Sequence, residues 1–335
     1  MTRERTIPQE DATSVVQARP ELGGGNATPS LALPEGAPEG LPAGLGETRV
    51  GPRTFRWGER TFVMGILNVT PDSFSGDGLL AGSGDPVETA VRVGRQMVED
   101  GADILDVGGE STRPGHTAVD ADEERRRVVP VIEALRAALP GTPISVDTTK
   151  PAIAEAALVA GADLLNDVWG VGPDDALRRL AADHGVPLIV MHNRDEPRYT
   201  TFLPELIADL QRAIERALRL GVGWDDLIVD PGFGFGKTPD HNLEVLRSLD
   251  ILRVLGRPIL LGTSRKSTLG RVLDLPAGER LEATLATTAL GIARGADIVR
   301  VHDVRANVRV ARMSDAIVRG TWREDATEPA EGDTT

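Results

Sequence analysis

The chain has 335 residues, 40% of them hydrophobic, and a formal net charge of −14. This length and apolar content predict a folded domain with a substantial core, while the acidic balance argues against a nucleic-acid partner. Cysteine is absent, which excludes disulfides, thiolate nucleophiles and cysteine metal sites. No apolar stretch approaches the roughly 18 residues that span a bilayer, so we expect no membrane partner and predict a cytoplasmic location.

Both ends of the chain have the composition of disordered tails. Residues 1–50 contain six Pro and seven Gly without sustained periodicity, and residues 321–335 carry one basic and five acidic side chains. Such segments bury too little apolar surface to fold. We therefore predict a disordered tail at 1–50, one barrel domain at 51–320 and a short acidic tail at 321–335.

Between the tails, short apolar runs alternate with amphipathic helical patterns. The runs predict eight strands that begin near Thr61, Asp103, Pro143, Asp163, Pro187, Asp226, Arg257 and Asp297. The first helix is predicted to start at the N-cap Asp85, with Pro86 next, and to end at Gly101 in the left-handed conformation. The phrase Gly-Ala-Asp recurs at 101–103, 161–163 and 295–297. Eight such units predict an α/β fold, a single-domain (β/α)8 TIM barrel, with a doubly wound open sheet as the alternative.

Each apolar run ends in one or two polar residues. They are Asn68, Asp106 with Glu110, Asp147, Asn166, His192, Asp230, Ser264 with Lys266, and Arg300 with His302. The carboxyl ends of barrel strands meet at one face, where barrel enzymes place their active sites. These residues therefore predict a site assembled from the whole length of the chain.

Several of these side chains suit a planar, polar ligand. Asp147 and Asn166 can form directional hydrogen bonds with a heterocycle that carries N–H donors and carbonyl acceptors. Phe235, in a chain with only 3% aromatic residues, can offer it a ring face. The alternatives are a helix cap for Asp147 and a simple turn residue for Asn68. The segment 230–237 meets the phosphate-binding P-loop pattern only in part, so we reject a nucleotide site there.

Cationic residues predict that the ligand also carries phosphate. Thr112 and Arg113 follow adjacent glycines after the second run, and Lys266 follows the seventh. Arg300 and His302 alternate on the eighth run, so both face one side of the strand, although a structural role is the alternative for His302 alone. Cations near strands seven and eight mark the usual anion position in barrels.

Taken together, these segments resemble the dihydropteroate synthase family of pterin-binding barrels over about residues 60–320. The resemblance is carried by five motifs in order: Asn68-Val-Thr-Pro-Asp-Ser-Phe-Ser75, Gly109-Glu-Ser-Thr-Arg-Pro-Gly115, Asp230-Pro-Gly-Phe-Gly-Phe-Gly-Lys237, Ser264-Arg-Lys-Ser267 and Arg300-Val-His-Asp303. The family fold is the predicted barrel. The chain departs from the family after His192, where it reads Asn193-Arg194-Asp195.

The resemblance implies a transferase of folate biosynthesis. It would condense 6-hydroxymethyl-7,8-dihydropterin diphosphate with 4-aminobenzoate, giving 7,8-dihydropteroate and diphosphate. The resemblance implies a Mg²⁺ cofactor near Asn68 and a homodimer. Alternatives are a methyltetrahydrofolate-dependent corrinoid methyltransferase and a catalytically inactive pterin-binding paralogue.

The resemblance also assigns roles to residues of this chain. The implied catalytic groups are Asp147, Asp230, Lys266, Arg300 and His302. The pterin would be held by Asp147, Asn166, Asp230 and Lys266, with Met191 and Phe235 packed beside it. Diphosphate would be held by Asn68, Arg300 and His302. The aminobenzoate pocket would be shaped by Phe74, Thr112, Arg113, Pro114 and Ser267.

Overall fold

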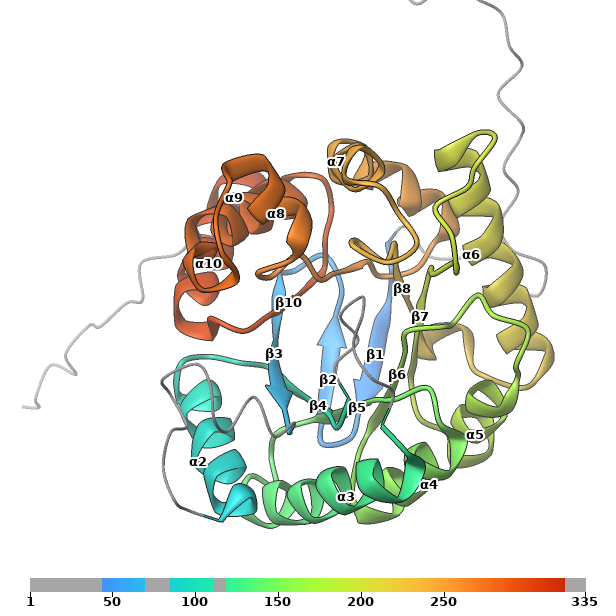
Figure 1. Cartoon of the computed structure of the whole chain (residues 1–335), viewed down its shortest axis with the longest axis vertical. Helices are drawn as coiled ribbons and strands as arrows, with labels where there is room; N and C mark the ends of the chain where they lie inside the picture. The colour runs from blue at the N-terminus through green and yellow to red at the C-terminus, as the bar shows by residue number, and fades with distance from the viewer. Residues whose placement is uncertain (1–43, 70–84, 111–118, 323–335) are drawn as a thin grey trace, which may run out of the picture. The chain divides into compact units, whose positions relative to one another are not determined.

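The computed structural model describes residues 44–69, 85–110 and 119–322. Its centre is a sheet of eight parallel strands in the order β8-β7-β6-β5-β4-β3-β10-β9 (Figure 1). A parallel bridge between Val229 and Ile259 joins the two edge strands and closes the ring. The strands are β3 Phe62–Asn68, β4 Ile104–Gly108, β5 Ile144–Asp147, β6 Leu164–Asp167, β7 Leu188–Met191, β8 Leu227–Asp230, β9 Leu260–Leu261 and β10 Ile298–Val301. The predicted (β/α)8 barrel is confirmed.

Helices surround the barrel, as Figure 1 shows. They are α2 Pro86–Glu99, α3 Ala121–Ala138, α4 Pro151–Ala160, α5 Ala176–His184, α6 Phe202–Arg219, α7 Pro239–Arg247, α8 Ser267–Leu273, α9 Leu281–Ala293 and α10 Val304–Val318. Short 3-10 helices lie at Trp224–Asp226, Leu249–Leu255 and Ala277–Glu279. The ends of α2 match the prediction, because the Asp85 carboxylate accepts the Val87 N–H at 2.9 Å and Gly101 has φ +104°. None of the helices in the described ranges is both long and apolar enough to cross a membrane, and the cytoplasmic location stays a prediction.

The repeated Gly-Ala-Asp motif has the same structural role at all three positions. Each of its aspartates precedes a strand and accepts a backbone N–H from the start of the neighbouring strand, at 2.9–3.0 Å: Val63 to Asp103, Ile144 to Asp163 and Ile259 to Asp297. Each also pairs with an arginine: Arg60, Arg136 and Arg319 respectively. The repeat therefore fixes strand register at the amino-terminal face of the barrel.

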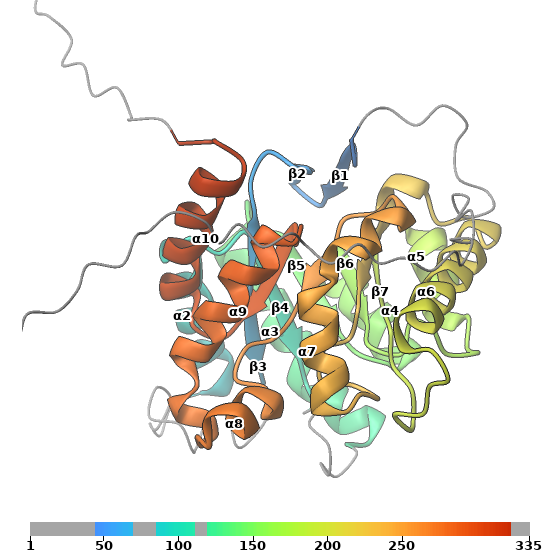
Figure 2. The ribbon, with the colours of Figure 1, turned by 90° about the horizontal axis from the view of Figure 1, so that it is seen from above.

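The amino-terminal face is closed by an antiparallel hairpin, β1 Glu47–Val50 and β2 Arg53–Arg56. Phe55 and Trp57 pack with the inward-facing residues of the barrel strands, among them Met64 and Ile104, to form a separate buried cluster. Figure 2 shows the hairpin at the end of the barrel opposite α8. Closing this end leaves the carboxyl-terminal face as the open mouth.

The structure corrects two predicted boundaries. The strand β1 lies within the segment predicted as a disordered tail, and Val50 is completely buried there. This strand, Glu-Thr-Arg-Val, alternates exposed and buried residues but buries the polar Thr48, so it shows no alternation of polar and apolar residues that would stand out from a Pro- and Gly-rich segment. The seventh barrel strand is also shorter than predicted and begins at Leu260. The remaining residues of the two predicted tails lie outside the described ranges.

Candidate active site

A cavity of about 450 Å³ opens at the carboxyl ends of the barrel strands. Predicted site residues line it: Asn68, Asp147, Phe235, Lys266, Ser267, Arg300 and His302. A neighbouring cavity of about 340 Å³ shares Asp147 and Phe235 with it, and is bounded on its other side by Trp169 and Arg194. Asn166, Met191 and Asp230 are almost completely buried at the ends of β6, β7 and β8.

An arginine and two acids meet at the mouth of the barrel. Arg300 donates from Nε to Asp106 Oδ2 at 2.5 Å and from Nη2 to Asp147 Oδ2 at 2.7 Å. Asn166 donates to the same Asp106 oxygen at 3.2 Å. These residues come from four strands, and the strand register places their side chains on the interior of the barrel. The barrel thus holds one cation between two carboxylates.

The two acids have unused hydrogen-bonding capacity. Within the described residues, Asp106 Oδ1 and Asp147 Oδ1 are buried and accept no hydrogen bond. Burial raises the pKa of Asp147 to about 7, although Arg300 opposes the shift. A buried acceptor without a donor is costly. These oxygens are therefore suited to a ligand that brings N–H donors.

Lys266 and Asp230 form the other side of the site. Lys266 Nζ donates to the backbone oxygen of Phe233 and lies 4.4 Å from the centre of the Phe235 ring. Burial lowers the pKa of Lys266 to about 8, opposed by the charges of Asp230 and Asp147. Burial raises the pKa of Asp230, opposed first by Lys266, and its Oδ1 accepts the Gly232 N–H at 2.7 Å. Asp230 and Lys266 thus stabilise each other's charged forms.

His302 and Asn68 lie at the rim. The Nδ1 atom of His302 is 3.0 Å from Ser264 Oγ, and that oxygen also accepts the His302 backbone N–H at 3.1 Å. Asn68 is the half-buried last residue of β3. The two side chains border the same cavity as Arg300. This rim can present a histidine, an amide and an arginine to an anion.

Comparisons with known proteins agree with this geometry. The family model described as "Pterin binding enzyme" matches residues 64–302. The dihydropteroate synthase of Bacillus subtilis (strain 168) is 50% identical over 267 residues, which cover 80% of this chain and 92% of that protein. The one from Clostridium beijerinckii is 49% identical, covering 81% and 99%. The chain belongs to the dihydropteroate synthase family.

Solved structures of dihydropteroate synthases are similar throughout the barrel. One from Clostridium difficile, described in the presence of pteroic acid, has a TM-score of 0.75 at 49% identity and covers 79% of this chain and 99% of that chain. One from Xanthomonas albilineans, in complex with 7,8-dihydropteroate, has a TM-score of 0.73 at 39% identity, covering 81% and 98%. As a member of this family, the chain is a transferase. The relatives are named as synthases, and this favours the synthase over the methyltransferase alternative.

Several residues predicted from the family motifs lie outside the described ranges. They are Phe74, Thr112, Arg113 and Pro114. The last described residue before Thr112 in the sequence is Glu110, whose carboxylate pairs with Lys150 Nζ at 2.5 Å. Lys150 also pairs with Glu124 on α3, at 2.5 Å. The roles of the four residues therefore stay predictions.

His192 has a different role from the other residues that end the strands. Its ring contacts Asp209 on α6 at 3.2 Å from Nε2 and Lys237 Nζ at 2.9 Å from Nδ1. Burial lowers its pKa to about 4. Arg194, at which the sequence departs from the family motif, is bound to the same helix: it pairs with Asp209 at 2.7 Å and with Glu205 at 2.9 Å.

Two residues of the site had no predicted role. Asp106 is fully buried and binds Arg300, but it was predicted only as one of the polar residues at the ends of the strands; its signal was a charged residue inside the apolar run Ile104-Leu-Asp-Val-Gly108. Lys237 was noted only as the end of a motif. A single lysine after a glycine-rich loop gives no sequence signal of burial, so only its contacts reveal it.

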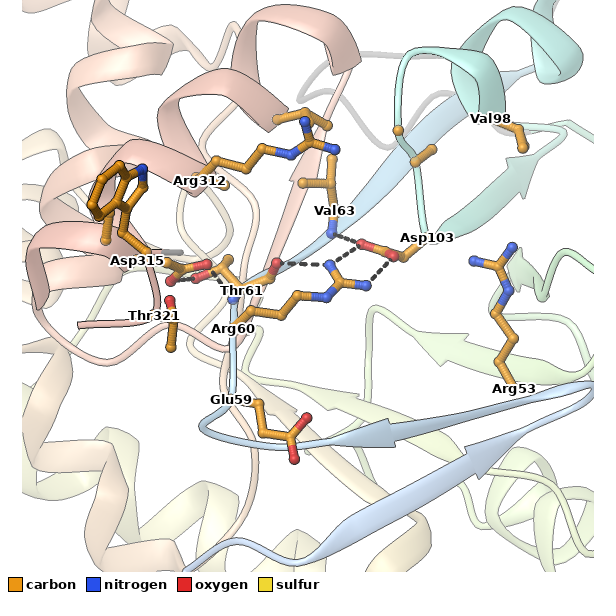
Figure 3. A pocket seen from close by; sticks show the side chains of 16 residues that line it. Arg53, Glu59, Arg60, Thr61, Val63, Val98, Asp103, Arg312, Asp315 and Thr321 are labelled. Atoms are coloured by element: carbon orange, nitrogen blue, oxygen red, sulfur yellow. Dashed lines mark hydrogen bonds and ion pairs between the residues drawn. The ribbon is translucent and has the colours of Figure 1, made fainter. Parts of the chain in front are cut away.

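A cavity of about 660 Å³ at the amino-terminal face is not a second candidate (Figure 3). Both of its buried acids are already bound by the protein: Asp103 accepts from Arg60 through both oxygens, and Asp315 accepts from the backbone and side chain of Thr61. Thr61 and Asp103 precede β3 and β4, at the face that serves stability in barrel enzymes. The chemistry is therefore assigned to the carboxyl-terminal mouth.

Proposed function

We propose that the described mouth binds 6-hydroxymethyl-7,8-dihydropterin diphosphate and 4-aminobenzoate and joins them to give 7,8-dihydropteroate and diphosphate. The observation that carries this proposal is the cluster of Arg300, Asp106 and Asp147, in which two buried carboxylate oxygens have no donor among the residues that the structure describes. A pterin ring offers several N–H donors together with a carbonyl oxygen. It would satisfy these oxygens as few other ligands can.

The pterin subsite consists of Asp147, Asn166, Asp230 and Lys266. The acids accept ring N–H groups, while the amide and the ammonium group donate to ring acceptors. Met191 is buried at the end of β7 and supplies an apolar contact, and Phe235 supplies an aromatic face. Because the subsite is buried, each of these hydrogen bonds acts with little competition from water.

The diphosphate subsite consists of Asn68, Arg300 and His302. Arg300 and His302 offer N–H donors to phosphate oxygens, and Arg300 keeps its charge because Asp106 and Asp147 raise its pKa against the effect of burial. The described residues contain no group of three acidic, histidine or cysteine side chains that could hold a metal. Mg²⁺ commonly takes few protein ligands and keeps waters and substrate phosphates, so the Asn68 amide oxygen fits it. When bound, Mg²⁺ would neutralise charge on the leaving diphosphate.

The reaction needs no protein nucleophile. The C–O bond from the pterin methylene to diphosphate breaks, and the amine nitrogen of 4-aminobenzoate forms the new C–N bond and loses a proton. Asp147 and Asp230 stabilise the electron-poor ring, and Arg300 and His302 stabilise the leaving anion. Ser267, at the start of α8, lies at the same mouth and is assigned to the arylamine.

The test is to follow diphosphate release by the full chain with the pterin diphosphate, 4-aminobenzoate and Mg²⁺. We expect release only when both organic substrates are present, together with one equivalent of 7,8-dihydropteroate. Reactions without the arylamine, and with the variant Asp230→Asn, serve as controls. Pterin binding without diphosphate release would support the inactive-paralogue alternative and contradict this proposal.

We also propose that the chain forms a homodimer through the outer face of α9 and α10. Leu290 on α9 and Met313 and Ile317 on α10 are all more than half exposed. Met313 and Ile317 are four positions apart and so lie on one side of the helix. A second copy would cover this apolar face. Light scattering should give twice the chain mass for the wild type and a monomer for Ile317→Asp, and a monomeric wild type would contradict the proposal.

A further inference from the structure

Lys237 is half-buried at the end of the loop after β8 and has no part in the bond-forming step proposed above. Its Nζ atom is 2.9 Å from His192 Nδ1 and donates to the backbone oxygens of Phe235 at 3.0 Å and His192 at 3.3 Å. Burial lowers its pKa to about 7, and the nearby Asp230 opposes the shift. All three donors of the ammonium group are therefore used on atoms of the protein.

One acceptor of Lys237, His192, is itself anchored to α6. His192 is neutral because of its low pKa, so its Nδ1 accepts from Lys237 and its Nε2–H donates to Asp209. Although burial opposes it, hydrogen bonds from His192 and Arg194 keep the pKa of Asp209 at about 2. Hydrogen bonds from Lys237 to His192 and from His192 to Asp209 thus connect the loop after β8 to a helix outside the barrel.

The loop between Asp230 and Lys237 packs tightly against the end of β7. A Cβ atom on Gly232 would lie 1.9 Å from the His192 backbone oxygen, and one on Gly236 would lie 2.4 Å from that of Arg194. Both glycines have positive φ, at +68° and +53°. The loop therefore has little freedom to move toward β7, and Lys237 prevents it from moving away.

The same loop holds the pterin-binding lysine from the opposite side. The backbone oxygen of Phe233 accepts from Lys266 Nζ, and the ring of Phe235 lies 4.4 Å from that atom. From this geometry we infer that Lys237 is a positioning residue for the pterin subsite: by tying the loop after β8 to His192, it sets where Phe235 and the Phe233 carbonyl hold Lys266. The inference rests on the proposed pterin ligand.

The experiment compares Lys237→Met with the wild type. Methionine keeps the length and the apolar stem but has no donors. Calorimetric titration with the pterin diphosphate, in the absence of arylamine, should show affinity weakened about tenfold, as for the loss of a hydrogen bond from a charged donor. In steady-state assays the KM for the pterin substrate should rise, while the KM for 4-aminobenzoate stays nearly the same. A merely structural role would not separate the two constants.

Arg257→Met is the matched control. Arg257 is a buried cation that, like Lys237, donates to backbone oxygens, those of Trp224 at 2.8 Å and Leu45 at 3.0 Å, but it lies at the amino-terminal face. Its loss should lower Tm without weakening pterin binding. Equal pterin affinity in Lys237→Met and the wild type, or equal weakening in both variants, would overturn the inference.

Lys237→Gln covers the case in which the methionine variant does not fold. Its amide keeps two N–H donors, so its pterin affinity should lie between those of the wild type and a donor-free side chain, with Tm closer to the wild type. Wild-type affinity in a folded Lys237→Gln would also contradict the inference. If the wild type binds pterin but releases no diphosphate, the proposed function fails, and the binding comparison still decides the role of Lys237.

Discussion

Arg300 on β10 and Asp147 on β5 are joined by a 2.7 Å hydrogen bond, although 153 residues separate them in the chain. The bond links a residue assigned to the diphosphate with one assigned to the pterin. The two subsites are therefore not independent. A change at Arg300 must alter the charge balance around the pterin ring as well as the binding of the leaving group.

Arg300→Ala should destabilise the folded chain as well as weaken binding. It leaves the buried carboxylates of Asp106 and Asp147 without their cation, and removing one partner from a buried ion pair costs about 3–5 kcal/mol. Urea unfolding at neutral pH measures the loss, with Arg265→Ala as a control, because the Arg265–Asp303 pair is more exposed. A loss for Arg300→Ala no larger than that of the control would show that the cluster contributes little to stability.

Asp147→Asn should change how stability depends on pH. Burial raises the pKa of Asp147 from its usual 3.8 to about 7 in the folded chain. Between these pH values the folded chain keeps a proton that the unfolded chain has lost, so the contribution of Asp147 to stability falls as pH rises. The free energy of unfolding of the variant, relative to that of the wild type, should therefore rise from pH 4 to 7 and then level off. The rise should be at most on the order of 1.4 kcal/mol for each unit by which folding raises the pKa of Asp147.

Unfolding curves at intervals across this pH range measure the difference for Asp147→Asn. The variant should also bind the pterin diphosphate more weakly, because the amide has one oxygen acceptor where the carboxylate has two. A difference in stability that stays constant over the whole range would mean that Asp147 does not titrate in this window.

Lys266→Ala and Ser267→Ala should affect different substrates. Lys266 is in contact with the pterin-side loop, and its removal also leaves Asp230 without its nearest cation, so pterin affinity should fall by about tenfold or more. Ser267→Ala should raise mainly the KM for 4-aminobenzoate. Calorimetry and steady-state kinetics on both variants test this division, and the opposite pattern of losses would reverse the assignment.

Gly232→Ala should be damaging because the backbone leaves no room for a methyl group. Its φ is +68°, and the added Cβ would lie 1.9 Å from the His192 backbone oxygen. Gly185→Ala is the control, since Gly185 has a similar φ of +61° with nothing within 4 Å of the added atom. The control should lose about 1–2 kcal/mol from the left-handed conformation alone. Gly232→Ala should lose more, together with pterin binding; equal losses in unfolding experiments would contradict the clash.

The amino-acid sequence alone determined the local elements. The starts of the barrel strands, the cap at Asp85 and the turn at Gly101 follow from residue patterns of short range, and the structure confirms them except at the seventh barrel strand, which begins at Leu260. The polar residues that end the strands could be predicted to lie at one mouth of the barrel, because parallel barrel strands all point the same way. The family motifs then assigned roles to Asp147, Asp230, Lys266 and Arg300, which remain to be tested.

Tertiary structure decided which of these groups touch. Asp106 was predicted at the mouth without a role, because its sequence signal is one charge in an apolar strand, whereas its partner Arg300 lies on a strand at the other end of the chain. The hairpin that begins at Glu47 is stabilised by burial of Phe55 and Trp57 under the barrel, not by its own short pattern. The position of Lys237 likewise depends on its hydrogen bonds to His192 and to the backbone oxygens around it. Burial and hydrogen bonding between distant segments set these features, and no local pattern in the sequence encodes them.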